Sequence, residues 1–354
     1  MLRLESMTNR KLRIAQIAPL WIPVPPKTYG GIELMLSVLV EELCDRGWSI
    51  SLFASEDSLT KANLIPATPR ALWLRKDLRS PHAVIVRLIK MVCDRRHNFD
   101  VIHNHFDFFM FPLLMNHECP PVLTTLHRPI DEESARVARS FPKMNFCAIS
   151  QDQRQSAEEK KLKVVDVIYN GIDPKIYPFN KNPEDYFIYL GRLNQEKGII
   201  QAIQVAMAAG VRLIVAGNVA GPVEWNYFLH EVQPFLNEEG IQFVGEVSFA
   251  EKIQFLKKAK GLLFPIDRRE PFGLVMIEAM ACGTPVFAFN QGSVPEVVVD
   301  GKTGFIVKDK DEMVGAIKKI DSIKRLDCRR HVEQNFTLKQ MVDKYEKLYQ
   351  RLTN

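Results

Sequence analysis

Short apolar segments alternate with segments of helical periodicity in two successive series, and this alternation constrains the fold more than any other feature of the chain. The first series of expected strands comprises 11–19, 49–54, 100–105, 121–127, 145–150 and 165–171. The second series comprises 185–193, 211–217, 241–247, 261–266, 284–289 and 303–307. Strands that alternate with helices form parallel sheets with helices on both faces. The sequence therefore predicts an α/β protein with two doubly wound, Rossmann-like domains.

The domain boundaries follow from these two series. A chain of 354 residues, of which 46% are hydrophobic, is long enough to build two cores. The Asn-Gly-Ile-Asp-Pro turn at 170–174 separates the series, so we expect one domain at 11–174 and another at 175–335. The remaining segment, 336–354, has the apolar stripe of an amphipathic helix and must pack on an apolar surface.

The charge balance and the cysteine spacing exclude several classes of protein. The 47 basic and 42 acidic residues are too evenly mixed for a dedicated nucleic-acid-binding protein. The six cysteines are widely separated, which argues against a disulfide framework or a zinc site and for a reducing, cytoplasmic compartment. Residues 1–10 lack the apolar run of a signal peptide, and no later stretch is long enough to span a bilayer. We expect these first residues to form a loose tail, with Met1 and Met7 both open as the native start.

The segment 270–285 (EPFGLVMIEAMACGTP) predicts a helix that opens after Gly273 and stops at Gly283. A helix N-terminus presents unpaired N–H groups and about half a positive charge. The amides around Gly273, Leu274 and Val275 are therefore suited to hold a diphosphate without a metal.

Two glutamates flank this helix start. Glu270 lies just before it, and Glu278 lies about two turns inside the helix. A carboxylate beside a phosphate is unfavourable unless it binds hydroxyl groups, so we assign Glu270 to a sugar and Glu278 to the ribose. An acidic cap on a surface helix explains two glutamates equally well when they are considered alone.

A second segment, GRLNQEKG at 191–198, follows the first strand of the second domain. Its Arg192 and Lys197 are expected at the carboxyl edge of the sheet, where open α/β folds bind ligands. Two fixed cations there suit a diphosphate leaving group, whose negative charge grows as its bond to a sugar breaks. The alternative is a solvated basic loop.

Together the two segments resemble the retaining glycosyltransferases of family 4 (group 1), which have the GT-B fold. The resemblance rests on E-x7-E within EPFGLVMIEAMACGTPV and on G-R-L-x-x-E-K-G, and further matches follow in order: P-x-x-x-G-G-I-E (26–33), DVIHNH (100–105), TLH (125–127), YNGID (169–173), VAG (215–217) and GSVPEVVxDGxTG (292–304). It implies an acceptor domain and a donor domain that face each other across a cleft. It also implies that the C-terminal helix packs back on the first domain.

The resemblance also implies roles for individual residues. Arg192 and Lys197 would hold the diphosphate. The backbone from Phe272 through Gly273 and Leu274 to Val275 would contact phosphate and sugar. Glu270 would bind the sugar hydroxyls, Glu278 would bind the ribose, and Val247 would contact the base. On the first domain, Gly30 and Gly31 would approach the donor phosphates and the acceptor, and His127 would lie by the transferred sugar at the reaction centre. We expect His103 and His105 in the core and the acceptor-side wall instead.

The reaction implied is the transfer of a hexose from a UDP- or GDP-sugar to a hydroxyl of a carbohydrate, lipid or small-molecule acceptor. It would keep the anomeric configuration by a same-face mechanism and require neither a metal nor any other cofactor. An epimerase or a phosphorylase on the same fold, and a non-catalytic nucleotide-sugar-binding protein, remain alternatives. A dinucleotide-dependent dehydrogenase is disfavoured because PLWIPVPPKTYGG, and not G-x-G-x-x-G, follows the first strand.

Three further features have structural explanations as well. The D-x-D at 309–311 resembles a manganese-binding motif, but Asp311 is expected to cap a helix. Glu296 is expected at a helix start. The basic segment 69–96 is explained either by a solvated helix face or by contact with the inner face of a membrane.

Overall fold

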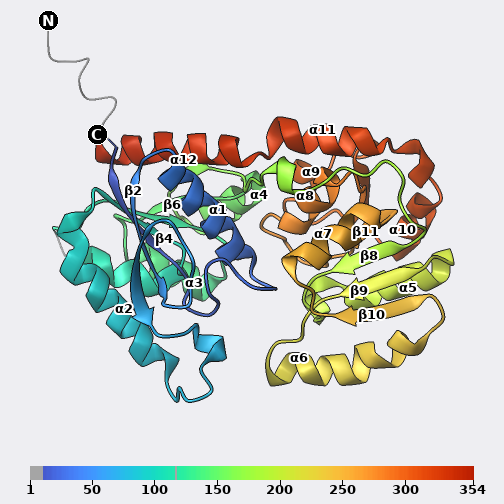
Figure 1. Ribbon diagram of the computed structural model, residues 1–354, viewed down its shortest axis with the longest axis horizontal. Coiled ribbons are helices and arrows are strands. Elements are labelled where there is room, and N and C mark those ends of the chain that lie inside the picture. The colour runs from blue at the N-terminus through green and yellow to red at the C-terminus, as the bar shows by residue number, and fades with distance from the viewer. Residues whose placement is uncertain (1–10, 116–117) are drawn as a thin grey trace, which may run out of the picture.

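The structure, a computed structural model, describes residues 11–115 and 118–354 as two α/β domains side by side (Figure 1). Each domain is built on one sheet in which the registered strand pairs are parallel, and helices pack around it. The predicted fold class is therefore confirmed. The tail expected at 1–10, and with it the choice between Met1 and Met7, lies outside the described residues.

The N-terminal sheet has seven strands in the order β3-β2-β1-β4-β5-β6-β7. Its strands are β1 Arg13–Ile17, β2 Ser49–Ser55, β3 Asn63–Thr68, β4 Val101–Asn104, β5 Val122–Thr125, β6 Asn145–Ala148 and β7 Val164–Val167. Its helices are α1 Gly31–Asp45, α2 Pro81–Arg95, α3 Glu132–Arg139 and α4 Gln151–Glu159.

The C-terminal sheet has six strands in the order β10-β9-β8-β11-β12-β13. Its strands are β8 Phe187–Leu190, β9 Leu213–Ala216, β10 Ile241–Gly245, β11 Gly261–Phe264, β12 Val286–Phe289 and β13 Gly304–Val307. The helices that follow the domain boundary are α5 Ile199–Ala209, α6 Gly221–Tyr227, α7 Phe249–Lys258, α8 Leu274–Ala281, α9 Val294–Val297, α10 Lys310–Ile317, α11 Arg325–Asn335 and α12 Leu338–Thr353.

Strand β3 was not among the predicted strands. It lies at the edge of the N-terminal sheet, beside β2, and its first four residues are exposed or half-buried. It also contains Pro66, which edge strands tolerate because they need fewer backbone donors. The proline within its short apolar run disfavours a strand in a prediction from sequence.

The cap of helix α10 differs by two residues from the prediction. The carboxylate of Asp309, and not that of Asp311, accepts a hydrogen bond from the backbone N–H of Glu312 at 2.9 Å. Asp311 lies inside the first turn, where an acidic side chain favours the positive helix end. Both aspartates of the D-x-D motif therefore have helix-terminus roles.

The chain crosses between the domains at two places that lie side by side. The backbone N–H of Ile172 donates to the carbonyl of Phe336 at 3.0 Å, and the N–H of Leu338 donates to the carbonyl of Ile172 at 2.7 Å. A Cβ atom on Gly171 would lie 2.4 Å from the Thr337 carbonyl oxygen, so this close approach requires glycine.

Helix α12 follows the second crossing and packs on the N-terminal domain. Figure 1 shows α11 and α12 in red along one edge of the molecule, each beside a different domain. The side chains of Met341, Tyr345 and Tyr349 are buried in one cluster with residues of β1 and α1. Arg46, which directly follows α1, adds an ion pair to Asp343 of α12 at 2.6 Å. The C-terminal helix thus ties the two domains together.

Candidate functional site

The helix expected to bind an anion begins as predicted. Gly273 precedes α8 with a left-handed φ of 75°, and no side chain caps the helix. A Cβ there would lie 2.7 Å from the Met276 side chain, so a larger residue meets both backbone strain and a clash. No side chain therefore occupies the N–H groups of Leu274 and Val275, which can meet a ligand, whereas the Met276 N–H donates to the Gly273 carbonyl at 2.9 Å.

The start of α1 faces the start of α8 across the domain junction. A Cβ on Gly31 would lie 3.5 Å from the Leu274 side chain. Gly30, just before it, has a φ of 148°, and a Cβ at this position would lie 2.8 Å from Pro26. The two domains thus bring two helix N-termini close to each other.

Two cations lie at the carboxyl ends of the C-terminal strands, each paired with a carboxylate. Lys197 Nζ lies 2.7 Å from Glu270 Oε2, so the structure brings these two predicted residues together. Arg192 instead pairs with Glu224 of α6, a partner that was not predicted from the sequence. Glu224 lies in a short helix without a recognisable motif, so only the tertiary structure reveals this pair.

Glu278 is buried, with 3% of its side chain exposed. Its Oε1 accepts a hydrogen bond from the Tyr177 hydroxyl at 2.9 Å and pairs with Lys252 of α7. Burial and the neighbouring carboxylate raise the pKa of the Tyr177 phenol well above its ordinary value. Lys252 and Tyr177 were not predicted, and both hold this carboxylate in place.

The first domain contributes the loop before α1. Thr28 Oγ1 donates to Glu246 Oε1 at 2.6 Å, and the backbone N–H of Tyr29 donates to the same oxygen at 3.3 Å. Burial raises the pKa of the Tyr29 phenol, and Arg192 opposes this rise. The loop therefore closes onto the end of β10, where half-buried Val247 follows.

Phe272 is directed into the core. It is 1% exposed, and its ring lies 5.9 Å from that of Phe336 and 6.1 Å from that of Tyr169. Its side chain therefore belongs to the core, and any contact with a ligand would have to come from its backbone.

His127 follows β5 on the first domain, and its Nε2 lies 2.9 Å from His105 Nδ1. Burial and the neighbouring Arg128 lower the pKa of His127 to about 3, so the imidazole is neutral at physiological pH. His103 and His105 are fully buried behind it. A buried network that includes Gln16 connects them, and the sequence signal for it was a polar residue inside an otherwise apolar strand.

Glu296 has a wider role than that of a helix-start residue. It lies in α9, but its carboxylate accepts hydrogen bonds from the backbone N–H groups of Gln151 and Asp152, each at 2.7 Å. It therefore caps α4 of the other domain. Arg269, just before Glu270, pairs with Asp152 at 2.9 Å and strengthens the same junction.

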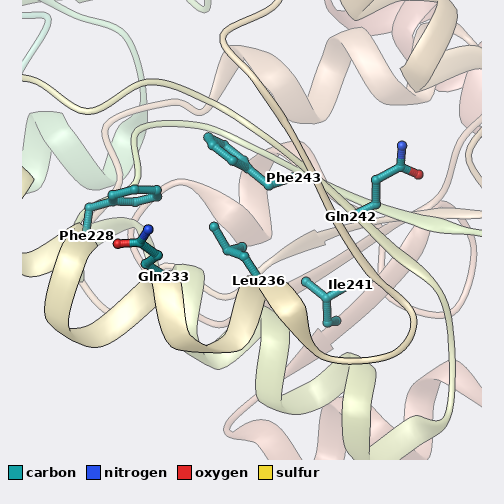
Figure 2. A pocket seen from close by; sticks show the side chains of 6 residues that line it. All are labelled: Phe228, Gln233, Leu236, Ile241, Gln242 and Phe243. Atoms are coloured by element: carbon teal, nitrogen blue, oxygen red, sulfur yellow. The ribbon is translucent and has the colours of Figure 1, made fainter.

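Residues 11–115 and 118–354 contain no group of three or more His, Cys, Asp or Glu side chains arranged to hold a metal ion. Within the same residues, no helix has the length and apolar character needed to cross a bilayer. A pocket on the second domain lies between β10 and the helical segment 228–237 before it (Figure 2). Its lining consists of Phe228, Gln233, Leu236, Ile241, Gln242 and Phe243, and it includes none of the predicted site residues.

Two family models match the chain in succession. "Glycosyltransferase Family 4" matches residues 29–176, and "Glycosyl transferases group 1" matches residues 173–337. The glycogen synthase of Mycobacterium tuberculosis is 26% identical over 314 residues, which cover 77% of this chain and 75% of that protein. The two matched regions coincide with the two domains that meet at the site.

Solved structures share the whole architecture. Sucrose-phosphate synthase from Thermosynechococcus elongatus superposes with a TM-score of 0.80 at 20% identity, covering 96% of this chain and 98% of that one. The Anabaena protein HepE, solved in complex with UDP-glucose, superposes with a TM-score of 0.77 at 18% identity, covering 95% and 99%. These likenesses support the GT-B fold.

Proposed function

Because the chain belongs to the group 1 glycosyltransferases, with a first domain of the family 4 type, we propose that it transfers a hexose from a nucleotide diphosphate sugar to an acceptor hydroxyl with retention of configuration. The donor would bind mainly to residues 175–335, and the acceptor to residues 11–174. Residues 336–354 would couple the two domains during closure.

The observation that carries this proposal is the ion pair between Lys197 and Glu270 beside the uncapped start of α8. When a diphosphate binds to the helix N–H groups, Lys197 can exchange its carboxylate for a phosphate oxygen. Glu270 is then released to accept hydrogen bonds from sugar hydroxyls. This single exchange would thus free Lys197 for the diphosphate and Glu270 for the sugar.

The remaining donor contacts follow from their positions. Arg192 would bind the diphosphate after it leaves Glu224, and Glu278 would accept from the ribose hydroxyls. Gly30 and Gly31 would approach the phosphates from the first domain, and Val247 would contact the base. Lys197, Arg192 and the α8 dipole together supply the positive charge that the leaving group needs, so the proposed reaction requires no metal.

The proposed reaction proceeds on one face of the sugar. The bond from the anomeric carbon to the diphosphate oxygen breaks, and a bond to the acceptor oxygen forms on the same side. The departing phosphate oxygen takes the acceptor proton. Glu270 would bind the hydroxyls of the sugar, and His127 would lie beside it, so that both contact the reacting group.

A contact with the inner face of a membrane is a separate proposal. Between residues 69 and 96 lie Trp73, Leu74 and Val86, which are 54%, 53% and 64% exposed. Basic residues surround them, and this combination suits an anionic lipid surface. Co-sedimentation with phosphatidylglycerol vesicles, compared with phosphatidylcholine vesicles, tests it; equal recovery in both pellets contradicts it.

Product analysis tests the proposed function. The protein is incubated with UDP-glucose, the first donor to try because HepE was solved with it, and with GDP-mannose, each with candidate acceptors. We expect release of the nucleoside diphosphate and a new α-glycosidic signal by NMR. A rearranged free sugar without an acceptor product would instead indicate an epimerase, and donor binding without turnover would indicate a non-catalytic binding protein.

A further inference from the structure

A chain of buried polar side chains connects helix α12 to His127. The Gln16 side-chain amide N–H donates to the Tyr349 hydroxyl at 3.0 Å, and Gln16 Oε1 lies 2.9 Å from His105 Nε2. His105 Nδ1 in turn lies 2.9 Å from His127 Nε2. Gln16 and Tyr349 are 0% exposed and His105 is 1% exposed, so water cannot replace these partners.

The amide of Gln16 sets the direction of the hydrogen bonds. Its nitrogen can only donate and its oxygen can only accept. Because the oxygen faces His105, His105 carries its proton on Nε2. Burial keeps the pKa of His105 well below its ordinary value, so this ring is neutral and its Nδ1 is an acceptor. His127 therefore donates from Nε2.

The other end of the chain agrees with this direction. The Tyr349 hydroxyl accepts from Gln16, so its own proton goes to His103 Nδ1 at 2.7 Å. His103 Nε2 then donates to Thr125 Oγ1 at 2.7 Å. Thr125 is left to donate to the Tyr345 hydroxyl at 3.1 Å. Each donor has one acceptor, which makes the direction consistent along the whole network.

We propose that Gln16 is a positioning residue that holds His127 with an unprotonated Nδ1, and that this nitrogen accepts a hydrogen bond from a hydroxyl of the transferred sugar. His127 Nδ1 has no hydrogen-bond partner among the described residues, whereas Nε2 is occupied by His105. The neutral ring presents a lone pair, which attracts a hydroxyl and repels a carboxylate. At the sugar carbon that Nδ1 faces, the site should therefore favour a hydroxyl over a carboxylate, and hence a neutral hexose over a hexuronate.

This inference rests on the proposed function, because it takes the transferred sugar to lie beside His127. The tautomer of His127, on which the inference depends, can be tested without any substrate. Nitrogen-15 NMR of the imidazole rings in the ligand-free protein, with His127 assigned by its loss in His127→Asn, should show the Nε2–H tautomer for His127. A proton on Nδ1, or a doubly protonated ring, overturns the proposal even if no variant can be produced.

Two substitutions test the role of Gln16 in the same spectra. Gln16→Met keeps the approximate volume but removes both hydrogen bonds to its neighbours, so His127 should become a mixture of tautomers. Tyr345→Phe is the matched control. Like Gln16, Tyr345 is fully buried, but it lies on α12 and its hydroxyl bonds to Thr125 and not to Gln16. An unchanged His127 spectrum in Gln16→Met contradicts the positioning role.

The preference between two donor sugars tests the proposed hydrogen bond from the sugar hydroxyl to His127. The ratio of kcat/KM for UDP-glucose over UDP-glucuronate should be high in the natural protein and about tenfold lower in Gln16→Met, since one hydrogen bond of ordinary strength is disordered. Tyr345→Phe should keep the ratio. An equal ratio in Gln16→Met overturns the proposal. No turnover of any nucleotide sugar by the natural protein counts against the proposed function, whereas the tautomer result remains decisive for Gln16.

Discussion

The two sides of the domain junction hold their polar groups in opposite ways. On the C-terminal side, Arg192, Lys197 and Lys252 are each paired with a carboxylate, and these side chains are 32%, 21% and 14% exposed. On the N-terminal side, His127 ends a neutral network whose inner members are fully buried. A charged pair near solvent can exchange its carboxylate for a phosphate, whereas a buried neutral network cannot change partners without leaving a donor unsatisfied. Under the proposed function, the donor side would therefore bind by exchange, whereas the other side is organised before any ligand binds.

The contrast is tested most strongly at Lys197. In the proposed reaction Lys197 would face the leaving group, so kcat in Lys197→Ala should fall by about a thousandfold while the fold is retained. Steady-state kinetics and circular dichroism measure the two effects. Lys260→Ala is the control, because Lys260 pairs with Asp185 at 3.1 Å outside the site. Near-normal turnover in Lys197→Ala would sink the phosphate assignment.

A substitution at Glu278 distinguishes a role in binding the nucleotide from a role in a structural ion pair. Glu278→Ala leaves Lys252 buried without its carboxylate, and the free energy of unfolding should drop by about 3 kcal/mol. It should also weaken UDP binding more than it changes the choice of sugar. Chemical denaturation and calorimetry measure these effects.

The double variant Lys252→Met with Glu278→Leu is the control for this experiment. It should recover part of the lost stability, because no charge is then buried alone although the Tyr177 hydroxyl still lacks its acceptor, but it should not recover nucleotide affinity. Full UDP affinity in either variant rules out the ribose role of Glu278.

The buried carboxyl of Glu33 makes the free energy of unfolding depend on pH. Burial raises the pKa of this carboxyl from 4.5 to about 7, although Arg128 opposes the shift. The folded protein holds this proton more tightly than the unfolded chain, so the stabilisation is complete below pH 4.5 and is lost as the pH rises towards 7. Between pH 5 and pH 8, unfolding free energy should fall by about 2 kcal/mol more in the natural protein than in Glu33→Gln. Parallel pH profiles for the two proteins would refute this.

The smallest effect is expected at Glu224. In Glu224→Ala, Arg192 loses its carboxylate before any donor binds, and a partly exposed ion pair is worth less than about 1 kcal/mol. UDP should therefore bind a few-fold more tightly by calorimetry. Glu231→Ala, a substitution further along the same region, should leave the affinity unchanged. Weaker UDP binding in Glu224→Ala would mean that Glu224 supports Arg192 and does not compete for it.

The features that the sequence predicted are the local ones. Buried strands reveal themselves by apolar runs, and α8 by glycine at both ends, so the two sheets and the uncapped helix were predictable. The partners of the charged groups were not, because Glu224, Lys252 and Tyr177 lie far along the chain from the residues they hold. Such pairings depend on how helices pack, which periodicity does not encode.

The same reason explains the other differences. Asp309 and not Asp311 caps α10 because the helix begins at Lys310, two residues earlier than the pattern indicated. Glu296 caps a helix of the other domain, a contact that only exists after the domains meet. Gln16 and Tyr349 could each be noticed in the sequence as a polar side chain on an otherwise apolar face. Their contact with each other could not be predicted, because it forms only in the folded structure.

Calorimetric titration with UDP, GDP and ADP, each with and without EDTA, tests the central claim most directly. The exchange account predicts micromolar binding of one nucleotide that survives EDTA and is lost in Lys197→Ala. Binding that EDTA abolishes would contradict the metal-free site, and binding that Lys197→Ala leaves unchanged would contradict the exchange of Lys197 from Glu270 to the diphosphate.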